Sequence, residues 1–103
     1  MLCALTVRTL EPGTFDRFRE AFMQAVDADD PPPGMVRFNM IRNVQNPDEV
    51  ICFGMFDGTV EQLREVTGEG RRGEQLAAIA PFVADVGADG LYEVVEDLAA
   101  APR

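Results

Sequence analysis

The sequence predicts an α+β domain whose elements follow one another in the order β-α-β-β-α-β. Three strand-like runs, 2–10, 35–43 and 50–57, are bounded by turn signals. Two segments show the spacing of apolar residues that is typical of amphipathic helices, and a last strand-like run covers 91–96. A chain of 103 residues with 47% apolar residues also fits a single domain.

The first strand stops at the turn Glu11-Pro12-Gly13, and a helix is expected directly after Thr14, a residue type that commonly caps helices. Its apolar face consists of Phe15, Phe18, Phe22, Ala25 and Val26. We expect this helix to end before the loop 29–34. The prolines at 31–33 cannot continue a helix, and they favour a stiff, extended connector.

The turn Asn46-Pro47-Asp48 separates two strand-like runs, which predicts a hairpin. If residues 45–48 form the turn, Val44 pairs with Glu49. One face of the hairpin then carries Phe38 opposite Met55 and Met40 opposite Phe53. The other face carries Arg37, Asn39 and Ile41 against Phe56, Gly54 and Cys52.

A second helix is expected after Thr59, because Thr59-Val60-Glu61-Gln62 fits a capping box. The glycines at 68 and 70 interrupt this helix, and helical spacing resumes from Glu74. Pro81 is expected to end or kink the segment. Residues 87–90 are then expected to form a turn before the last strand.

This order of elements is that of the ferredoxin-like fold with an antiparallel four-stranded sheet. We expect one domain over residues 1–98 and a loose C-terminal tail over 99–103. In this fold the first strand lies antiparallel to the third. Cys3 is therefore far from Cys52, and no disulfide between them is expected.

The composition excludes many kinds of function. The chain lacks His, Lys, Ser and Trp, which removes Ser-His-Asp hydrolases, catalytic lysines and histidine-held haem, zinc or iron. The acidic stretch with Asp27, Asp29 and Asp30 lacks the ligand spacing of a calcium loop. We therefore expect no metal and no cofactor.

The charge and the hydropathy pattern limit the partners and the location. A net charge of −9 without a basic stripe argues against nucleic acid and anionic membranes as partners. The first ten residues do not resemble a signal peptide, and no apolar run is long enough to span a bilayer. We expect a cytoplasmic protein.

The expected sheet is apolar on both faces, although its helices can cover only one of them. Phe38, Met40, Phe53 and Met55 would form a patch, next to Val36 and Ile51, that is too apolar to face water. The sequence therefore predicts a homodimer formed through this sheet face.

Four short motifs extend this pattern to a known family. They are Glu11-Pro12-Gly13 before a helix, the hairpin 46–49, the strand end Gly54-Met55-Phe56-Asp57-Gly58 and the closing run 91–95. With these motifs the chain, from Leu2 to Asp97, resembles the dimeric α+β barrel superfamily, and within it the antibiotic biosynthesis monooxygenase-like (ABM) domain. In that family two such sheets pack face to face, and the resemblance implies a dimeric barrel here.

Two positions depart from the family pattern. Many members have Trp at the position of Phe56 and His in the following helix, at the position of Glu65 or Val66. The haem-degrading, chlorite-handling and lactone-isomerising relatives depend on His, so the resemblance does not imply their activities. It leaves a cofactor-independent monooxygenase that acts on a small hydrophobic aromatic compound, as the anthrone-oxidising relatives do. The alternative is a non-catalytic dimer that binds a small ligand or serves as an accessory subunit.

Asn39 and Tyr92 are the expected catalytic residues. An amide within an apolar strand is suited to hold a substrate oxygen or an enolate-like oxyanion, and Tyr92, the one Tyr of the chain, to relay a proton. The structural alternatives stay open: an Asn39 amide satisfied in place and a Tyr92 ring that plugs an edge.

Substrate binding is expected from Arg37, Phe56, Phe22 and Gly54. Arg37 would hold a phenolate or carboxylate, the two aromatic rings would stack on the substrate, and Gly54 would leave space beside Asn39. Arg37 is equally suited to pair with a carboxylate across the dimer. Cys52 is expected to be buried and unreactive, because the chain has no His to act as its base.

Overall fold

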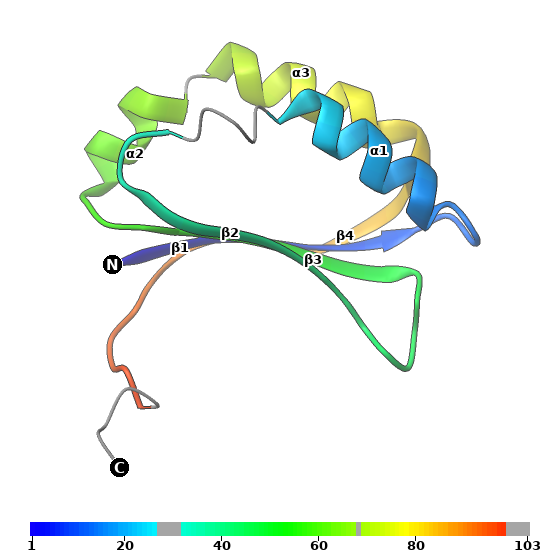
Figure 1. Ribbon diagram of the computed structural model, residues 1–103, viewed down its shortest axis with the longest axis horizontal. Coiled ribbons are helices and arrows are strands. Elements are labelled where there is room, and N and C mark those ends of the chain that lie inside the picture. The colour runs from blue at the N-terminus through cyan, green and yellow to red at the C-terminus, as the bar shows by residue number, and fades with distance from the viewer. Residues whose placement is uncertain (27–31, 68, 99–103) are drawn as a thin grey trace.

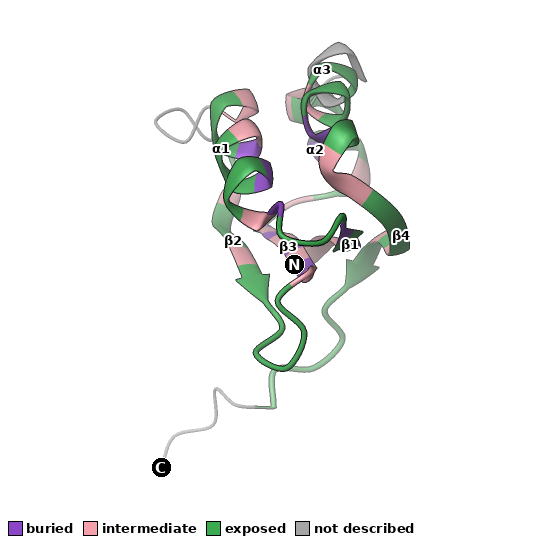
Figure 2. Ribbon diagram, turned by 90° about the vertical axis from the view of Figure 1, so that its right-hand side faces the viewer, coloured by how far each residue is buried: buried purple, intermediate pink, exposed green. Residues whose placement is uncertain are grey.

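The computed structural model of the protein describes residues 1–26, 32–67 and 69–98, with the backbone alone at 69–72. Helices cover one face of a four-stranded antiparallel sheet (Figures 1 and 2). The strands are β1 (Leu2–Leu10), β2 (Met35–Arg42), β3 (Glu49–Phe56) and β4 (Val83–Glu93). The helices are α1 (Phe15–Ala25), α2 (Val60–Thr67) and α3 (Glu69–Ile79), and the 3-10 turn η1 (Ala80–Phe82) follows α3. The strand order β2-β3-β1-β4 confirms the predicted ferredoxin-like fold.

The helix starts were predicted from the cap residues, and the structure confirms both. Thr59 and Gln62 form the capping box: the Thr59 N–H donates to Gln62 Oε1 at 2.8 Å and the Gln62 N–H to Thr59 Oγ1 at 3.2 Å. Thr14 precedes α1, but its hydroxyl donates to the Glu11 carbonyl at 2.7 Å instead of capping the helix. This bond ties α1 to the end of β1.

Two predicted boundaries in the second half of the chain are wrong. Helix α3 begins at Glu69, not at Glu74, although it ends before Pro81 as predicted. Residues 87–90 do not form a turn, because the last strand, expected over 91–96, runs from Val83 to Glu93 as β4. Asp89 and Gly90 pair with Thr6 and Leu5 of β1, and the register shift between Thr6 and Arg8 accommodates Gly87 and Ala88.

The predicted hairpin is present, but its register differs by one residue. The Asn43 N–H donates to the Glu49 carbonyl at 3.0 Å, so the connecting loop is one residue longer than expected. Phe38 consequently lies opposite Gly54, Met40 opposite Cys52 and Asn39 opposite Phe53. A shift of one residue moves every side chain of a strand to the other face of the sheet.

The register shift divides the predicted apolar patch. Phe38 lies on the helix face, where its ring stacks on Phe22 with a centroid distance of 5.9 Å, and Met40 packs against the core. Phe53 and Met55 lie on the opposite face. The expectation that Phe38, Met40, Phe53 and Met55 share one face is therefore wrong.

The hydrophobic core lies between the sheet and the helices. Its buried members are Leu10, Phe18, Phe22, Val50, Cys52 and Ile79. Cys3 and Cys52 are both free thiols, as predicted: Cys3 of β1 lies opposite Met55 of β3, and Cys52 of β3 lies opposite Thr6 of β1. No helix in the described ranges is long and apolar enough to cross a membrane. The predicted tail 99–103 and the aspartates at 27, 29 and 30 lie outside the described residues.

Candidate functional site

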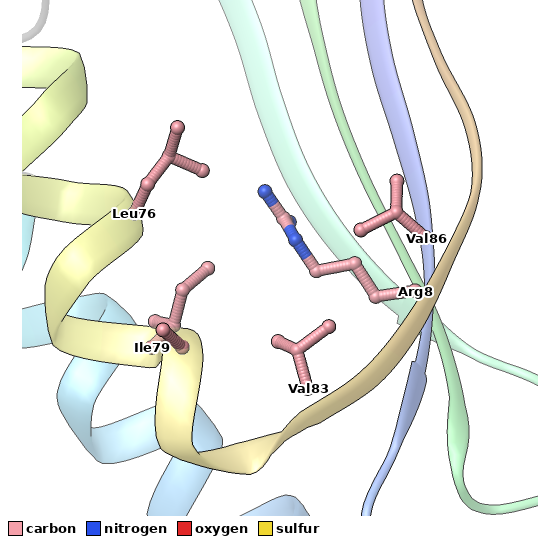
Figure 3. Close-up of a pocket in the computed structure, with 6 residues that line it drawn as sticks. Arg8, Leu76, Ile79, Val83 and Val86 are labelled. Carbon is pink, nitrogen blue, oxygen red and sulfur yellow. The ribbon is translucent and has the colours of Figure 1, made fainter.

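A pocket of about 270 Å³ lies between α3 and the sheet (Figure 3). Arg8 comes from β1, and apolar side chains form the remaining walls. These are Leu76 and Ile79 of α3, Ala80 of η1, and Val83 and Val86 of β4. Ile79 is only 1% exposed and closes the inner end, whereas Leu76 and Val86 are 41% and 47% exposed and lie at the mouth. The volume is at the lower limit of ligand pockets, which suits a small molecule.

Arg8 lies in this pocket because side chains along strand β1 alternate between the two faces of the sheet. Side chains of a strand point to opposite faces in turn, so Arg8 shares the helix face with Leu10, which is 1% exposed. The Arg8 side chain itself is only 7% exposed. Figure 3 shows its guanidinium extending from β1 toward α3, between the side chains of Leu76 and Val86.

The guanidinium of Arg8 is incompletely paired. Its Nη1 is buried and has no hydrogen-bond partner among the described residues. No carboxylate is found among the described residues that line the pocket. An unpaired charge in such a place costs free energy, because the protein does not replace the water that the charge has lost.

Cys52 is the neighbour of Arg8 in the core. Burial raises the pKa of the Cys52 thiol, and the positive charge of Arg8 and a hydrogen bond from it partly oppose this effect. At neutral pH the thiol of Cys52 therefore stays protonated, and it does not supply a negative charge to balance Arg8. Cys52 is buried, as the sequence predicted, and a raised pKa makes it a poor nucleophile.

The three predicted site residues on the helix face do not line the pocket. Phe22 and Phe56 are 3% and 2% exposed and pack within the protein interior. Gly54 lies opposite Phe38, not Asn39, and the space above it is filled. A Cβ at Gly54 would come within 2.9 Å of Met35 Sδ and 3.0 Å of Phe38 Cδ2. Gly54 therefore permits close packing of β2 side chains and leaves no space for a ligand.

The other predicted site residues lie on the opposite face of the sheet. Asn39 and Arg37 are exposed on β2, and Tyr92, 49% exposed, lies on β4. Strands β2 and β4 are the two edges of the sheet, three strand spacings or roughly 14 Å apart. Within one chain the structure therefore does not bring Asn39 or Arg37 together with Tyr92, and none of the three lines the pocket.

Comparison with known proteins gives matches at the level of structure only. No protein-family model matches the sequence, and no curated protein is significantly similar to it. A structure from Deinococcus radiodurans matches with a TM-score of 0.78 and 12% identity, over 99% of this chain and 100% of that one. One from Caulobacter crescentus matches with a TM-score of 0.76 and 14% identity, over 92% and 90%. Both are described as proposed antibiotic biosynthesis monooxygenases.

The chain has the fold of these proteins. A third structure, from Nitrosomonas europaea and described in the same way, agrees with a TM-score of 0.75 and 14% identity, over 93% of this chain and 100% of that one. The ferredoxin-like fold of the single chain that the resemblance to the ABM domain implied is thereby confirmed over nearly the whole chain. At such identities the likeness extends to the fold and not to the activity, because one fold serves many functions.

Proposed function

We propose that the protein is a cofactor-independent, monooxygenase-like enzyme that acts on a small hydrophobic aromatic compound held beneath α3. The observation that carries the proposal is the pocket between α3 and the sheet, whose walls are apolar apart from Arg8. The names of the proteins that share the fold support the reaction class. Apolar walls with few polar groups are typical of sites for small organic molecules.

The reaction would rely on the reactivity of the substrate. An anthrone-like substrate supplies all the electrons: two C–H bonds of its methylene group break, a C=O bond forms, and the second oxygen atom of O2 leaves as water. No external reductant is needed. The described lining residues include no carboxylate, imidazole or phenol that would act as a base. The proton would therefore pass to water at the mouth of the pocket, beside Leu76 and Val86.

The alternative is a protein that binds such a compound without transforming it. The positions of Asn39 and Tyr92 favour this alternative, because both lie on the sheet face away from the pocket. A pocket without a base would still bind and transport a hydrophobic ligand. Oxygen consumption decides between the two functions.

Oxygen uptake is expected when the protein is mixed with anthrone or a dihydroquinone in the presence of EDTA and without flavin. With anthrone, one anthraquinone and one water should form for each O2 consumed; with a dihydroquinone, one quinone and one hydrogen peroxide. Val86→Trp would fill the mouth of the pocket and is expected to lower the rate at least about tenfold, since a misplaced substrate loses the benefit of orientation. Val44→Trp is the matched control, because Val44 is 98% exposed in the hairpin loop. A rate equal to that of the protein-free reaction across the panel would refute the enzyme and favour the binding protein.

We also propose that a second copy of the chain covers the sheet face away from the helices, here called the open face. Its centre consists of Leu5, Val7, Ile51, Phe53 and Met55, which are all partly exposed. Ile41 and Tyr92, 46% and 49% exposed, extend it toward the two edges. The chain after β4 also leaves the sheet on this side, with Val95 and Leu98 each 83% exposed (Figure 1).

A second copy suits this face for two reasons. A two-fold dimer brings two identical apolar surfaces together, and large contiguous apolar surfaces are rare on monomers. Chains with a net charge of −9 repel one another, so they associate more readily through an uncharged surface. The five residues at the centre of the open face are all uncharged. Arg37 would lie at the rim of this dimer, in reach of carboxylates of the second copy.

A further inference from the structure

We propose that the pocket beneath α3 binds its ligand as an anion, with a carboxylate, phenolate or enolate oxygen on Arg8 and an aromatic ring between Leu76, Ile79 and Val83. The proposal rests on the proposed function only in taking this pocket as the substrate site. It adds the charge of the ligand and the residue that recognises it, neither of which follows from the fold.

The first argument is the unpaired nitrogen of Arg8. More than nine-tenths of the side chain is buried, and Nη1 has no hydrogen-bond partner among the described residues. Buried polar groups in native proteins are nearly always hydrogen-bonded, and exceptions call for an explanation. An oxygen of a bound anion is an acceptor that would complete the site.

The second argument is geometric. In Figure 3 the guanidinium stands in the pocket, between side chains of α3 on one side and of β4 on the other. A guanidinium presents several N–H donors in one plane, which suits the paired oxygens of a carboxylate. Nη1 has no partner among the described residues, and a small rotation of the guanidinium would present it to the ligand. The apolar walls would then contact the ring of the same molecule.

The third argument is that an arginine is unnecessary for packing at this position. The other lining residues are Leu, Ile, Ala and Val, and Leu10, the next residue on the same face of β1, is a core residue. An apolar side chain would fill the position without the cost of burying a charge. Residues that break the local pattern at such a cost are typical of functional sites.

The net negative charge of the chain means that any preference for an anion must come from a local positive group. A net charge of −9 disfavours the approach of any anion. A preference for an anionic over a neutral ligand of the same shape would therefore come from a local positive group. Among the described lining residues Arg8 is the one cation.

The test compares two probes of nearly equal shape, 1-naphthoate and 1-naphthalenemethanol, by titration calorimetry at pH 7 and low salt. The full-length protein is expected to bind the anion about tenfold to a hundredfold more tightly, the range of a charge-assisted hydrogen bond. Arg8→Met is expected to bind both probes equally. Arg19→Met, which removes an exposed charge from α1, is expected to behave as the unaltered protein. Inorganic phosphate, which lacks a ring, is expected to bind more weakly than 1-naphthoate by at least about tenfold.

Equal affinity of the unaltered protein for the two naphthalene probes would overturn the proposal, even if Arg8→Met failed to fold. An unchanged preference in Arg8→Met, or phosphate binding as tight as that of 1-naphthoate, would overturn it as well. Neither naphthalene probe is an oxidisable anthrone, so the result is independent of turnover. A preference for 1-naphthoate without oxygen uptake would keep the anion site and refute the enzyme. Oxygen uptake without a preference for 1-naphthoate would keep the enzyme and refute the anion site.

Discussion

Phe53→Glu is expected to lower the mass of the protein in solution from about twice 11.3 kDa to that of a single chain. Phe53 lies in the centre of the open face, between Leu5 of β1 and Asn39 of β2. In a two-fold dimer the variant would place two carboxylates within one apolar contact, where they lose their water and repel each other. Sedimentation velocity or light scattering measures the change.

Met23→Glu is the matched control for the dimer. Met23 is 44% exposed on α1, in the helix layer, so the same increase in charge there should leave the mass at that of a dimer. Phe53 is partly exposed in the single chain, and the variant is therefore expected to fold. A folded, unaltered protein with the mass of a monomer would refute the proposed dimer.

Arg8→Met is expected to raise the free energy of unfolding of the ligand-free protein by about 1–3 kcal/mol, the cost of leaving a buried polar group without a partner. For a domain of this size each kcal/mol corresponds to about 4–8 °C in melting temperature. Methionine keeps the unbranched stem of Arg8 and removes the incompletely paired guanidinium. Urea unfolding and thermal melting at one fixed protein concentration measure the change, because the proposed dimer would make stability depend on concentration.

Arg19→Met should change the stability by less than about 0.5 kcal/mol, as is usual for exposed positions. A lower stability of Arg8→Met would show that the guanidinium is satisfied in the ligand-free protein and serves the structure. With 1-naphthoate at a hundred times its Kd the unaltered protein should gain about 2.7 kcal/mol, and Arg8→Met should gain much less at the same ligand concentration. This combination, a residue that destabilises the empty protein and stabilises the complex, distinguishes a binding role from a structural one.

Local signals in the sequence predict most of the fold. The capping box at Thr59 and the Asn46-Pro47-Asp48 turn depend on neighbours along the chain, and both elements are confirmed. The length of the hairpin loop was not predictable in the same way. Strands β2 and β3 carry apolar residues on both faces, so the hydrophobic pattern does not choose between two registers one residue apart. The glycines at 87 and 90 are typical of a turn, but the pairing of Val86, Asp89 and Gly90 with β1 keeps this stretch within β4.

The ambiguity of the hairpin register also explains why the predicted site differs from the pocket. The incorrect register set Gly54 beside Asn39, and a site built around that pair was the consequence. Arg8 was not predicted, because Val7 and Leu10 lie on opposite faces of β1 and make both faces look apolar. The one signal was a charged residue in the middle of an apolar strand. Its meaning depends on α3, which lies more than sixty residues further along the chain and covers it.

A crystal structure of the protein with 1-naphthoate tests the central claim, that an anionic ligand binds to Arg8 beneath α3, most directly. We expect the carboxylate within about 3 Å of Arg8 Nη1, the usual hydrogen-bond distance, and the ring between Leu76, Ile79 and Val83. A ring in this pocket with its carboxylate turned to water beside Val86 would contradict the role of Arg8. Binding of 1-naphthoate on the open face alone, with the pocket beneath α3 empty, would contradict the site itself.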